Sequence, residues 1–284
     1  MGCRSAEQRC RLVTSRFELQ DAWSRMSPGG SNPSLTVLQR IYLTAMIVSN
    51  QLTNVFQIKC GNSQGTGFVL IEKDIEILLT ARHVVEAYGT SNIEFRRFGK
   101  WNALNVEPIE NPNVRCDAIA MQVISPSIFR GLKMQRAPGL LIGQEIYFLG
   151  FPIGLHTDAE THNDDYPIPL AKRGICAGIF GEGPDQVLYL DAMNTHGFSG
   201  GPLLCSTGTG ELGVFGIISG HRNRTVKAPV MPSGQLAHIN ENVGITTAYL
   251  LASALEGLPS KVIGSSESLW SKFHRLYSEP ERDR

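Results

Sequence analysis

Three residues that lie far apart in the sequence have the types needed for nucleophilic acyl transfer: Ser199, His83 and Asp117. A serine hydroxyl is a poor nucleophile until a neighbouring base removes its proton. A histidine serves as that base when a carboxylate binds its other ring nitrogen and fixes the tautomer. The three residue types therefore predict a hydrolytic triad, provided that the fold brings them together.

The surroundings of Ser199 favour this chemistry. The residue lies in the run GFSGGP at positions 197–202. A glycine two positions before the serine lets the backbone turn so that the N–H groups of Gly197 and Ser199 point at one oxygen, as an oxyanion intermediate requires. A glycine-rich hairpin turn has the same composition, so the run alone does not distinguish the two interpretations.

The flanks of His83 and Asp117 indicate strand ends. His83 follows the run ILLTAR at 77–82, and Asp117 precedes the apolar run AIAMQV at 118–123. A carboxylate at the head of a buried strand needs a partner, and an imidazole N–H is one. An ordinary histidine and a turn aspartate remain the alternatives.

Short apolar, β-branched runs recur from about residue 52 and are separated by Gly, Pro, Asn or Asp. They form two groups of six, parted by a loop at 126–139. Many short strands without intervening helices predict an all-β sandwich or a pair of barrels. The expected strands are 53–60, 66–72, 75–80, 92–98, 102–108 and 117–124, then 144–150, 173–180, 187–191, 202–206, 212–219 and 242–247.

Helical segments are expected on both sides of the strand region. Residues 1–50 have roughly helical apolar spacing, and 247–255 is typical of a closing helix before a tail of mixed charge. The predicted organisation is an N-terminal helical extension at 1–50, a first barrel at 51–125 with His83 and Asp117, a second barrel with the closing helix at 126–256 with Ser199, and a C-terminal tail at 257–284.

With these flanks and in this order, the three residues make the chain resemble the trypsin-like (chymotrypsin-fold) serine peptidases, especially the HtrA/Deg-type protease domain. Further matching runs are GFPIG at 150–154, YLDA at 189–192 and GVFGIISG at 213–220, so the resemblance covers roughly residues 52–255. It implies an all-β fold of two six-stranded antiparallel β-barrels. It also implies a serine endopeptidase that works through an acyl-enzyme and needs no cofactor and no metal.

The resemblance also implies roles for individual residues. Gly197 and Ser199 would form the oxyanion hole, and Ser219 would help to hold Asp117 and form a wall of the specificity pocket. Met193 would lie at the pocket base, where a carboxylate is absent, so we expect a medium-sized apolar residue before the scissile bond. The implied substrate-binding residues are Met193, Ser219, Gly220, His221 and Gly244.

The chain departs from the family pattern at three places. Phe198 stands where trypsin and its zymogens have an acid that pairs with a newly cut N-terminus, so activation through that salt bridge is not expected. No cysteine comes directly after His83, so we do not expect the disulfide common in secreted members. The residues after 255 are too few for the PDZ domain of HtrA proteins, which predicts a stand-alone protease module.

The composition limits the expected partners. Lys+Arg and Asp+Glu both number 26, so the formal net charge of zero supplies no electrostatic reason to bind nucleic acid or an anionic membrane. No signal peptide is visible and the longest apolar run, 41–48, is too short to span a bilayer. A cytoplasmic protein with reduced cysteines and a protein or peptide substrate is expected, whereas the oligomeric state is not indicated.

Other interpretations stay open. A catalytically silent barrel pair would bind an extended peptide by strand addition without cleaving it. The same fold also suits an esterase or a self-processing protease. The His, Asp and Glu residues at 156–165 are of metal-binding types, but their spacing matches no recognised site, so a solvated loop near the cleft is predicted there.

Overall fold

The computed structural model describes residues 47, 49–72, 75–111, 113, 115–124, 136–137, 139–157, 163–207, 211–230, 235–256 and 258. All of them belong to one of the chain's two compact units. The predicted extension at 1–50 and tail at 257–284 lie almost wholly outside these residues. Of the extension, the structure describes Ile47, Ser49 and Asn50, and the last two begin the short helix α3 (Ser49–Leu52).

Seven antiparallel strands form the first sheet, in the order β5-β4-β1-β2-β3-β7-β6. They are β1 (Val55–Cys60), β2 (Ser63–Glu72), β3 (Ile75–Thr80), β4 (Ile93–Arg97), β5 (Lys100–Ala103), β6 (Val106–Pro108) and β7 (Ile119–Val123). The edge strands β5 and β6 are joined by Leu104 and Asn105 alone. Because two linking residues span about 10 Å at most, the sheet has to curl until its edges approach each other.

This curled sheet occupies the place of the predicted first barrel, with one difference. The strand expected at 102–108 is divided in two, because β5 pairs with β4 whereas β6 pairs with β7. Leu104 lies at the crossing, is buried, and donates its N–H to the carbonyl of Ile93 at 2.9 Å. The first sheet therefore has seven strands rather than six.

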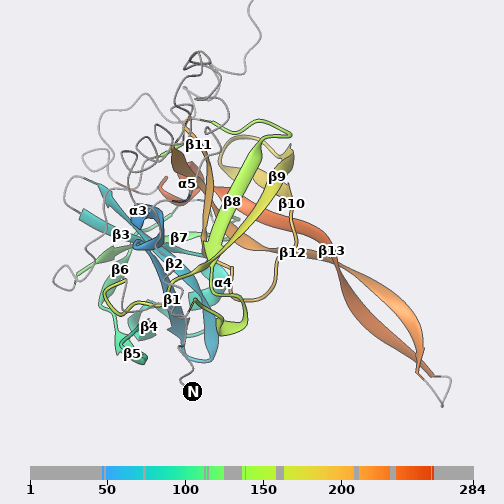
Figure 1. The fold of residues 1–284 in the computed structure, drawn as a ribbon, viewed down its shortest axis with the longest axis horizontal. Coiled ribbons are helices and arrows are strands. Elements are labelled where there is room, and N and C mark those ends of the chain that lie inside the picture. The colour runs from blue at the N-terminus through green and yellow to red at the C-terminus, as the bar shows by residue number, and fades with distance from the viewer. Residues whose placement is uncertain are drawn as a thin grey trace, which may run out of the picture. The chain divides into compact units, whose positions relative to one another are not determined.

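Six antiparallel strands close into the second barrel, in the order β10-β13-β12-β11-β8-β9 (Figure 1). They are β8 (Glu145–Gly150), β9 (Leu170–Phe180), β10 (Val187–Asp191), β11 (Pro202–Ser206), β12 (Leu212–Val230) and β13 (Gln235–Leu250). The short helices are α4 (Arg82–Val85), η1 (Thr90–Asn92), η2 (Pro152–Gly154), η4 (Gly183–Asp185) and α5 (Leu251–Ala254). The predicted all-β, chymotrypsin-like fold is confirmed.

The continuous apolar runs of β2 and β3 follow from burial on both faces. Successive strand residues point to opposite sides of a sheet. In β2, Phe68 and Leu70 join a core cluster that also contains Leu149 and Leu204 of the second barrel, whereas Val69 joins a cluster made of first-sheet residues and Tyr166. The two barrels are thus fixed to each other by apolar packing, which holds residues from both at constant distances.

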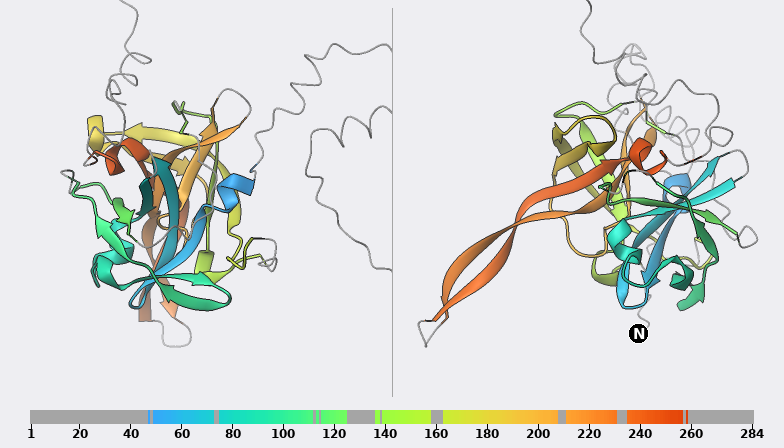
Figure 2. Two further views of the ribbon diagram at one scale, coloured as in Figure 1. Left: turned by 90° about the vertical axis from the view of Figure 1, so that its left-hand side faces the viewer. Right: turned by 180° about the vertical axis from the view of Figure 1, so that it is seen from behind.

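The β12–β13 hairpin is much longer than the strands predicted at 212–219 and 242–247. Its distal part leaves the barrel as a two-stranded ribbon (Figures 1 and 2). Cross-strand contacts stabilise this part, including an ion pair of 2.7 Å between Arg224 and Glu241 and a 2.9 Å hydrogen bond from Thr225 to Asn240. Most of the described ribbon residues are polar and exposed, and this hid the strand from apolar pattern analysis.

The closing helix predicted at 247–255 is wrong for its first half. Residues 247–250 continue β13, where Tyr249 pairs with Val187 on one side and Ile217 on the other. Buried and half-buried residues alternate from Thr246 to Leu250, which is the period of a strand. The helix α5 begins only at Leu251.

Burial in the core agrees with the expected state of four cysteines. Cys60, Cys116, Cys176 and Cys205 are free thiols and buried, whereas Cys3 and Cys10 lie outside the described residues. Burial raises the pKa of Cys116 and of Cys205 to about 12, so neither thiol is a nucleophile near neutral pH. None of the helices that the structure describes is long and apolar enough to cross a bilayer.

Candidate active site

Strand register brings His83 and Asp117 together. β3 pairs with β7 so that Thr80 lies opposite Ile119. His83 follows Thr80 by three residues and Asp117 precedes Ile119 by two, so both emerge at the same end of this strand pair. Arg82 ties the two segments together, because its side chain donates to the carbonyls of Cys116 and Ala118 at 3.2 and 3.4 Å.

The carboxylate of Asp117 accepts three hydrogen bonds. Its Oδ2 lies 2.8 Å from Nδ1 of His83 and accepts a 2.5 Å bond from the Ser219 hydroxyl, while its Oδ1 accepts a 3.0 Å bond from the His83 backbone N–H. These bonds orient the imidazole and engage its Nδ1, so Nε2 is the ring nitrogen that does not contact Asp117. Ser219, which the resemblance implied would help to hold Asp117, is the donor of the 2.5 Å bond.

The pKa values of the pair reflect these contacts. The hydrogen bond to Asp117 raises the pKa of His83 above its usual value, although partial burial acts in the opposite direction. Burial alone would raise the pKa of Asp117, but the hydrogen bonds from His83 and Ser219 outweigh it and lower that pKa. The carboxylate therefore stays ionised and stabilises a protonated imidazole.

The loop that carries Ser199 is anchored to the first sheet by Thr66. The N–H of Thr66 donates to the carbonyl of Ser199 at 2.8 Å, and its hydroxyl donates to the carbonyl of Gly197 at 2.6 Å. Gly200 has a φ of +87°, and a Cβ there would collide with the Thr66 carbonyl oxygen. Glycine at position 200 thus permits the close approach between the Ser199 loop and strand β2 of the first sheet.

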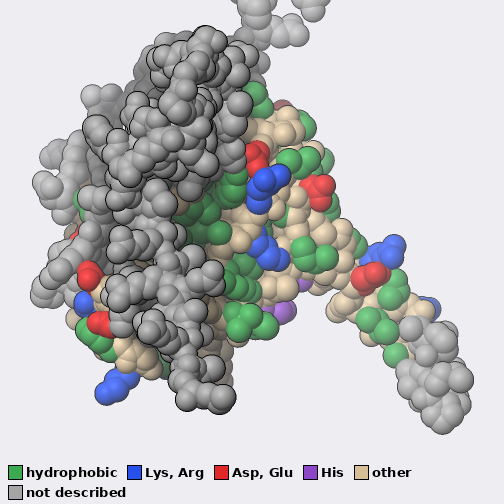
Figure 3. All heavy atoms as spheres, in the orientation of Figure 1, with side chains coloured by type: hydrophobic (Ala, Val, Ile, Leu, Met, Phe, Trp, Pro, Cys, Tyr) green, Lys and Arg blue, Asp and Glu red, His purple; other side chains and the backbone are tan. Residues whose placement is uncertain are grey.

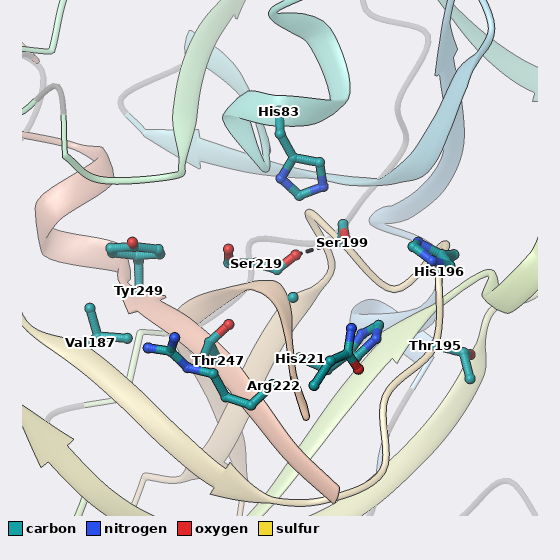
Figure 4. A pocket seen from close by; sticks show the side chains of 12 residues that line it. His83, Val187, Thr195, His196, Ser199, Ser219, His221, Arg222, Thr247 and Tyr249 are labelled. Carbon is teal, nitrogen blue, oxygen red and sulfur yellow. Dashed lines mark hydrogen bonds between the residues drawn. The ribbon is translucent and has the colours of Figure 1, made fainter. Parts of the chain in front are cut away.

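The Ser199 hydroxyl is not bonded to His83 in this structure. It donates instead to the carbonyl of Ser219 at 2.7 Å. Ser199, Ser219 and His83 line one cavity of about 460 Å³, and Figure 4 shows the imidazole facing the hydroxyl across it. Rotation about the serine Cα–Cβ bond, between ordinary staggered rotamers, is the motion that would redirect the hydroxyl toward the imidazole.

A backbone contact orients the peptide that precedes Gly197. The carbonyl of His196 accepts a 2.7 Å hydrogen bond from the N–H of Ile153. Because a trans peptide is planar, the N–H of Gly197 in the same unit points the opposite way. Among the described residues, the N–H groups of Gly197 and Ser199 donate to no other group, so both are available to an incoming oxyanion.

Ile153 and Gly197 both have left-handed backbones. Gly197 has a φ of +104°, and a Cβ on it would collide with the carbonyl of Phe151. Ile153 has a φ of +45°, which is a genuine outlier for a β-branched residue. Sequence reasoning selected the GFPIG run as a family match but missed this backbone role, which no side-chain pattern encodes.

The predicted substrate-binding residues divide into two groups. Ser219, Gly220 and His221 line the cavity, and beyond Ile217 β12 has no strand partner on its β11 side in the part of the chain that the structure describes. Met193 and Gly244 are not among the cavity residues. Met193 is 54% exposed, and its carbonyl accepts a 2.6 Å hydrogen bond from Lys172.

His221, one of the predicted substrate-binding residues, lies beside a second histidine in the cavity. Two histidines, His196 and His221, face each other with ring centroids 5.7 Å apart. Burial lowers the pKa of His221, and the proximity of His196 lowers it further. The sequence analysis assigned no role to His196 or to six further cavity residues on β10, β12, β13 and the Ser199 loop, which are Val187, Thr195, Arg222, Asn223, Thr247 and Tyr249.

Phe198 supports the Ser199 loop by burial. Its side chain is fully buried and packs edge-on against Phe148 with centroids 5.0 Å apart, while Lys172 lies 5.5 Å above its ring. A buried apolar side chain thus occupies the position at which trypsin and its zymogens have an acid.

Among the described residues, no group of three or more His, Cys, Asp or Glu side chains is placed to hold a metal ion.

The sequence also matches a known protein family over the part of the chain that carries the site. The family described as "Trypsin-like peptidase domain" matches residues 65–217, which include His83, Asp117 and Ser199. The match spans more than half of the chain, so the chain belongs to the trypsin-like peptidase domain family. No curated protein matches it.

Solved structures show the same fold at low identity. The inactive form of a mutant of Rv3671c from M. tuberculosis H37Rv has a TM-score of 0.51 and 17% identity, over 84% of this chain and 98% of that chain. The HtrA-type protease AlgW with tripeptide has a TM-score of 0.50 and 20% identity, over 76% of this chain and 62% of that chain. The predicted resemblance to trypsin-like peptidases and to the HtrA protease domain is confirmed.

Proposed function

We propose that the chain is a serine endopeptidase that hydrolyses protein or peptide substrates through an acyl-enzyme. One observation carries the proposal: a hydrogen-bonded chain runs from Ser219 through Asp117 to His83 and ends at a ring that shares a cavity with the Ser199 hydroxyl. Packing of a core or a turn does not require this arrangement. It is the arrangement that activates a serine.

The proposed reaction begins when the Ser199 hydroxyl turns from the Ser219 carbonyl toward His83. The imidazole accepts the hydroxyl proton as Ser199 attacks the substrate carbonyl, and Asp117 stabilises the resulting imidazolium. The N–H groups of Gly197 and Ser199 donate to the oxyanion. His83 then protonates the leaving amine and accepts a proton from the water that hydrolyses the acyl-enzyme.

We further propose a medium-sized apolar residue before the scissile bond. None of the described residues that line the cavity is an aspartate or glutamate, so they offer no counter-charge for Arg or Lys. A peptide library with every residue type at that position tests the proposal. Cleavage dominated by basic residues would contradict it.

A fluorophosphonate probe tests the endopeptidase proposal directly, because it forms a covalent bond only with an activated serine. We expect labelling of the wild type, located at Ser199 by peptide mapping. The variants Ser199→Ala and His83→Ala should show little labelling and lose most turnover. Labelling that is equal in wild type and Ser199→Ala would remove Ser199 from the mechanism.

The second candidate function is a silent module that binds an extended peptide along β12. The bond from Ser199 to the Ser219 carbonyl favours it, since the nucleophile is not aligned with the base in this structure. Such a module would remain unlabelled by the probe and would still bind peptides. The probe therefore separates the two candidates.

A further inference from the structure

Arg222 brings a positive charge to the cavity that contains Ser199 and His83. Its guanidinium donates a hydrogen bond to the Tyr189 hydroxyl and lies 5.1 Å from the centroid of that ring. The Tyr189 ring in turn packs against Phe180 at 4.4 Å. The cation is thus held on an aromatic support, which lowers the entropy cost of binding an anion.

The guanidinium groups of Arg222 and Arg224 differ in their partners among the described residues. In the part of the chain that the structure describes, no aspartate or glutamate forms an ion pair with Arg222. Arg224, two residues further along the same strand, is paired with Glu241 at 2.7 Å. Figure 3 shows basic and acidic side chains side by side on the projecting ribbon. The unpaired guanidinium is therefore the one that faces the cavity.

The backbone leaves room for a ligand next to this cation. A Cβ at Gly220 would have only the Thr247 hydroxyl oxygen within 4 Å, at 3.8 Å. The space beneath Gly220 therefore reaches Thr247, and Figure 4 shows the guanidinium extending from there toward Val187 and Tyr249. His221 points to the other side of the strand, toward His196.

The position along β12 sets which substrate residue would reach this space. An extended chain advances about 3.3 Å per residue, and the register of β12 shifts at both Ser219 and Arg222, so Arg222 lies at most roughly 10 Å along the strand from Ser219. Ser219 is the β12 residue that contacts the Ser199 hydroxyl. A substrate that follows this edge of β12 would therefore bring a side chain to Arg222 two to four residues from its scissile bond.

We propose that Arg222 forms a carboxylate subsite, so that the preferred substrates are peptides with Asp or Glu two to four residues from the scissile bond on the side that follows β12. This inference rests on the proposed endopeptidase function. The guanidinium would make charge-assisted hydrogen bonds to the carboxylate, with the Thr247 hydroxyl close enough to contribute a further one.

Paired peptides test the subsite by cleavage. Each pair is identical except for Glu or Gln at one of the four positions on either side of the scissile bond. We expect wild type to prefer Glu by about tenfold in kcat/KM within the two-to-four window. Arg222→Gln should reduce the Glu-to-Gln ratio to about one, and Arg222→Lys should keep part of it. The matched control Arg224→Gln removes a positive charge outside the cavity and should keep the full ratio.

A binding measurement separates failure of the subsite from failure of the peptidase. Fluorescein-labelled peptides of each pair are titrated with Ser199→Ala protein and with the double variant Ser199→Ala/Arg222→Gln, and anisotropy is recorded. We expect tighter binding of the Glu peptide only when Arg222 is present. Equal affinities for Glu and Gln peptides at every position, or a preference that survives Arg222→Gln, would overturn the subsite. Absence of cleavage with the binding preference intact would overturn the peptidase function alone.

Discussion

At the scale of single residues, two glycines with left-handed backbones differ in what surrounds them. Gly200 has a φ of +87° and lies against the Thr66 carbonyl and the Thr80 hydroxyl. Gly89 has a φ of +72°, and a Cβ added to it would meet no described atom within 4 Å. Gly200 is therefore required both by its positive φ and by the lack of space for a Cβ. Gly89 is required by its positive φ alone.

This contrast predicts different costs for alanine at the two positions. Gly89→Ala should lose about 2 kcal/mol, because a φ of +72° with a ψ of 159° lies in a backbone region that is essentially restricted to glycine, and this lowers Tm by roughly 4–8 °C in a domain of this size. Gly200→Ala should lower Tm by about 10 °C or more, because the backbone of the first sheet has to move as well. Calorimetry measures both. Equal shifts would show that the contact with Thr66 is not a tight one.

Asp117→Asn is expected to lower kcat by about 10⁴-fold, since an amide neither fixes the active tautomer nor stabilises the imidazolium. The acidic limb of the kcat/KM profile should also move. The hydrogen bond to Asp117 raises the pKa of His83, so in wild type the inactive imidazolium persists above the usual histidine value of about 6.5.

In Asp117→Asn the carboxylate is absent, so the acidic midpoint of the residual activity should fall. Rates recorded from about pH 4 to pH 9 with a neutral peptide give both midpoints, because histidines titrate within this range. Ser219→Ala is a milder control that keeps the carboxylate and should keep the high midpoint. An unchanged midpoint in Asp117→Asn would contradict the assignment of His83 as the base.

At the scale of elements, the short helix η2 orients the oxyanion peptide through the N–H of Ile153. Ile153→Pro removes this N–H and, because proline cannot adopt a φ of +45°, also displaces the η2 backbone, so it should lower kcat by roughly 10²-fold or more, at least the loss of one oxyanion donor. Ile153→Gly keeps the N–H and relieves the left-handed strain, so kcat should stay close to wild type and Tm should not fall.

Steady-state kinetics of both variants, with calorimetry to compare their stability, measure this effect. The Ile153 side chain is 76% exposed, so its loss should not disturb the core. Similar kcat values for the proline and glycine variants would show that the contact to His196 does not matter for turnover.

At the scale of the whole molecule, the distal β12–β13 ribbon is separable from the barrels. Two-stranded ribbons alone are marginally stable in water, and the side-chain hydrogen bonds described beyond Asn223 join the ribbon's own strands. Replacing residues 225–240 with Asn-Gly would close a two-residue turn between the facing residues Arg224 and Glu241.

This shortened protein should unfold within about 3 °C of wild type, because less than about 1 kcal/mol of barrel stability depends on the ribbon. Cleavage of short peptides should change by less than about threefold, since Ser219 to Arg222 are retained. Calorimetry and peptide kinetics check both expectations. A large fall in Tm would show that the ribbon contributes to the barrel itself.

The sequence by itself determined the local features. The apolar runs with period two fixed most strands, because each buries one or both faces, and the glycines around Ser199 marked a turn that other residues cannot adopt. The order His83, Asp117, Ser199 with these flanks identified the family. The sequence did not predict the divided strand at 102–108 or the ribbon, since the first changes its partner from β4 to β7 at Leu104 and the second lacks an apolar pattern.

Only the tertiary structure decided the arrangement of the site. Register between β3 and β7 places His83 beside Asp117, and packing of the two barrels brings Ser199 to the same cavity. The contact from Ile153 to His196, the bond from Ser199 to Ser219 and the unpaired charge of Arg222 are likewise absent from any local pattern. Each depends on the distance between segments, which is set by the packing of the whole core.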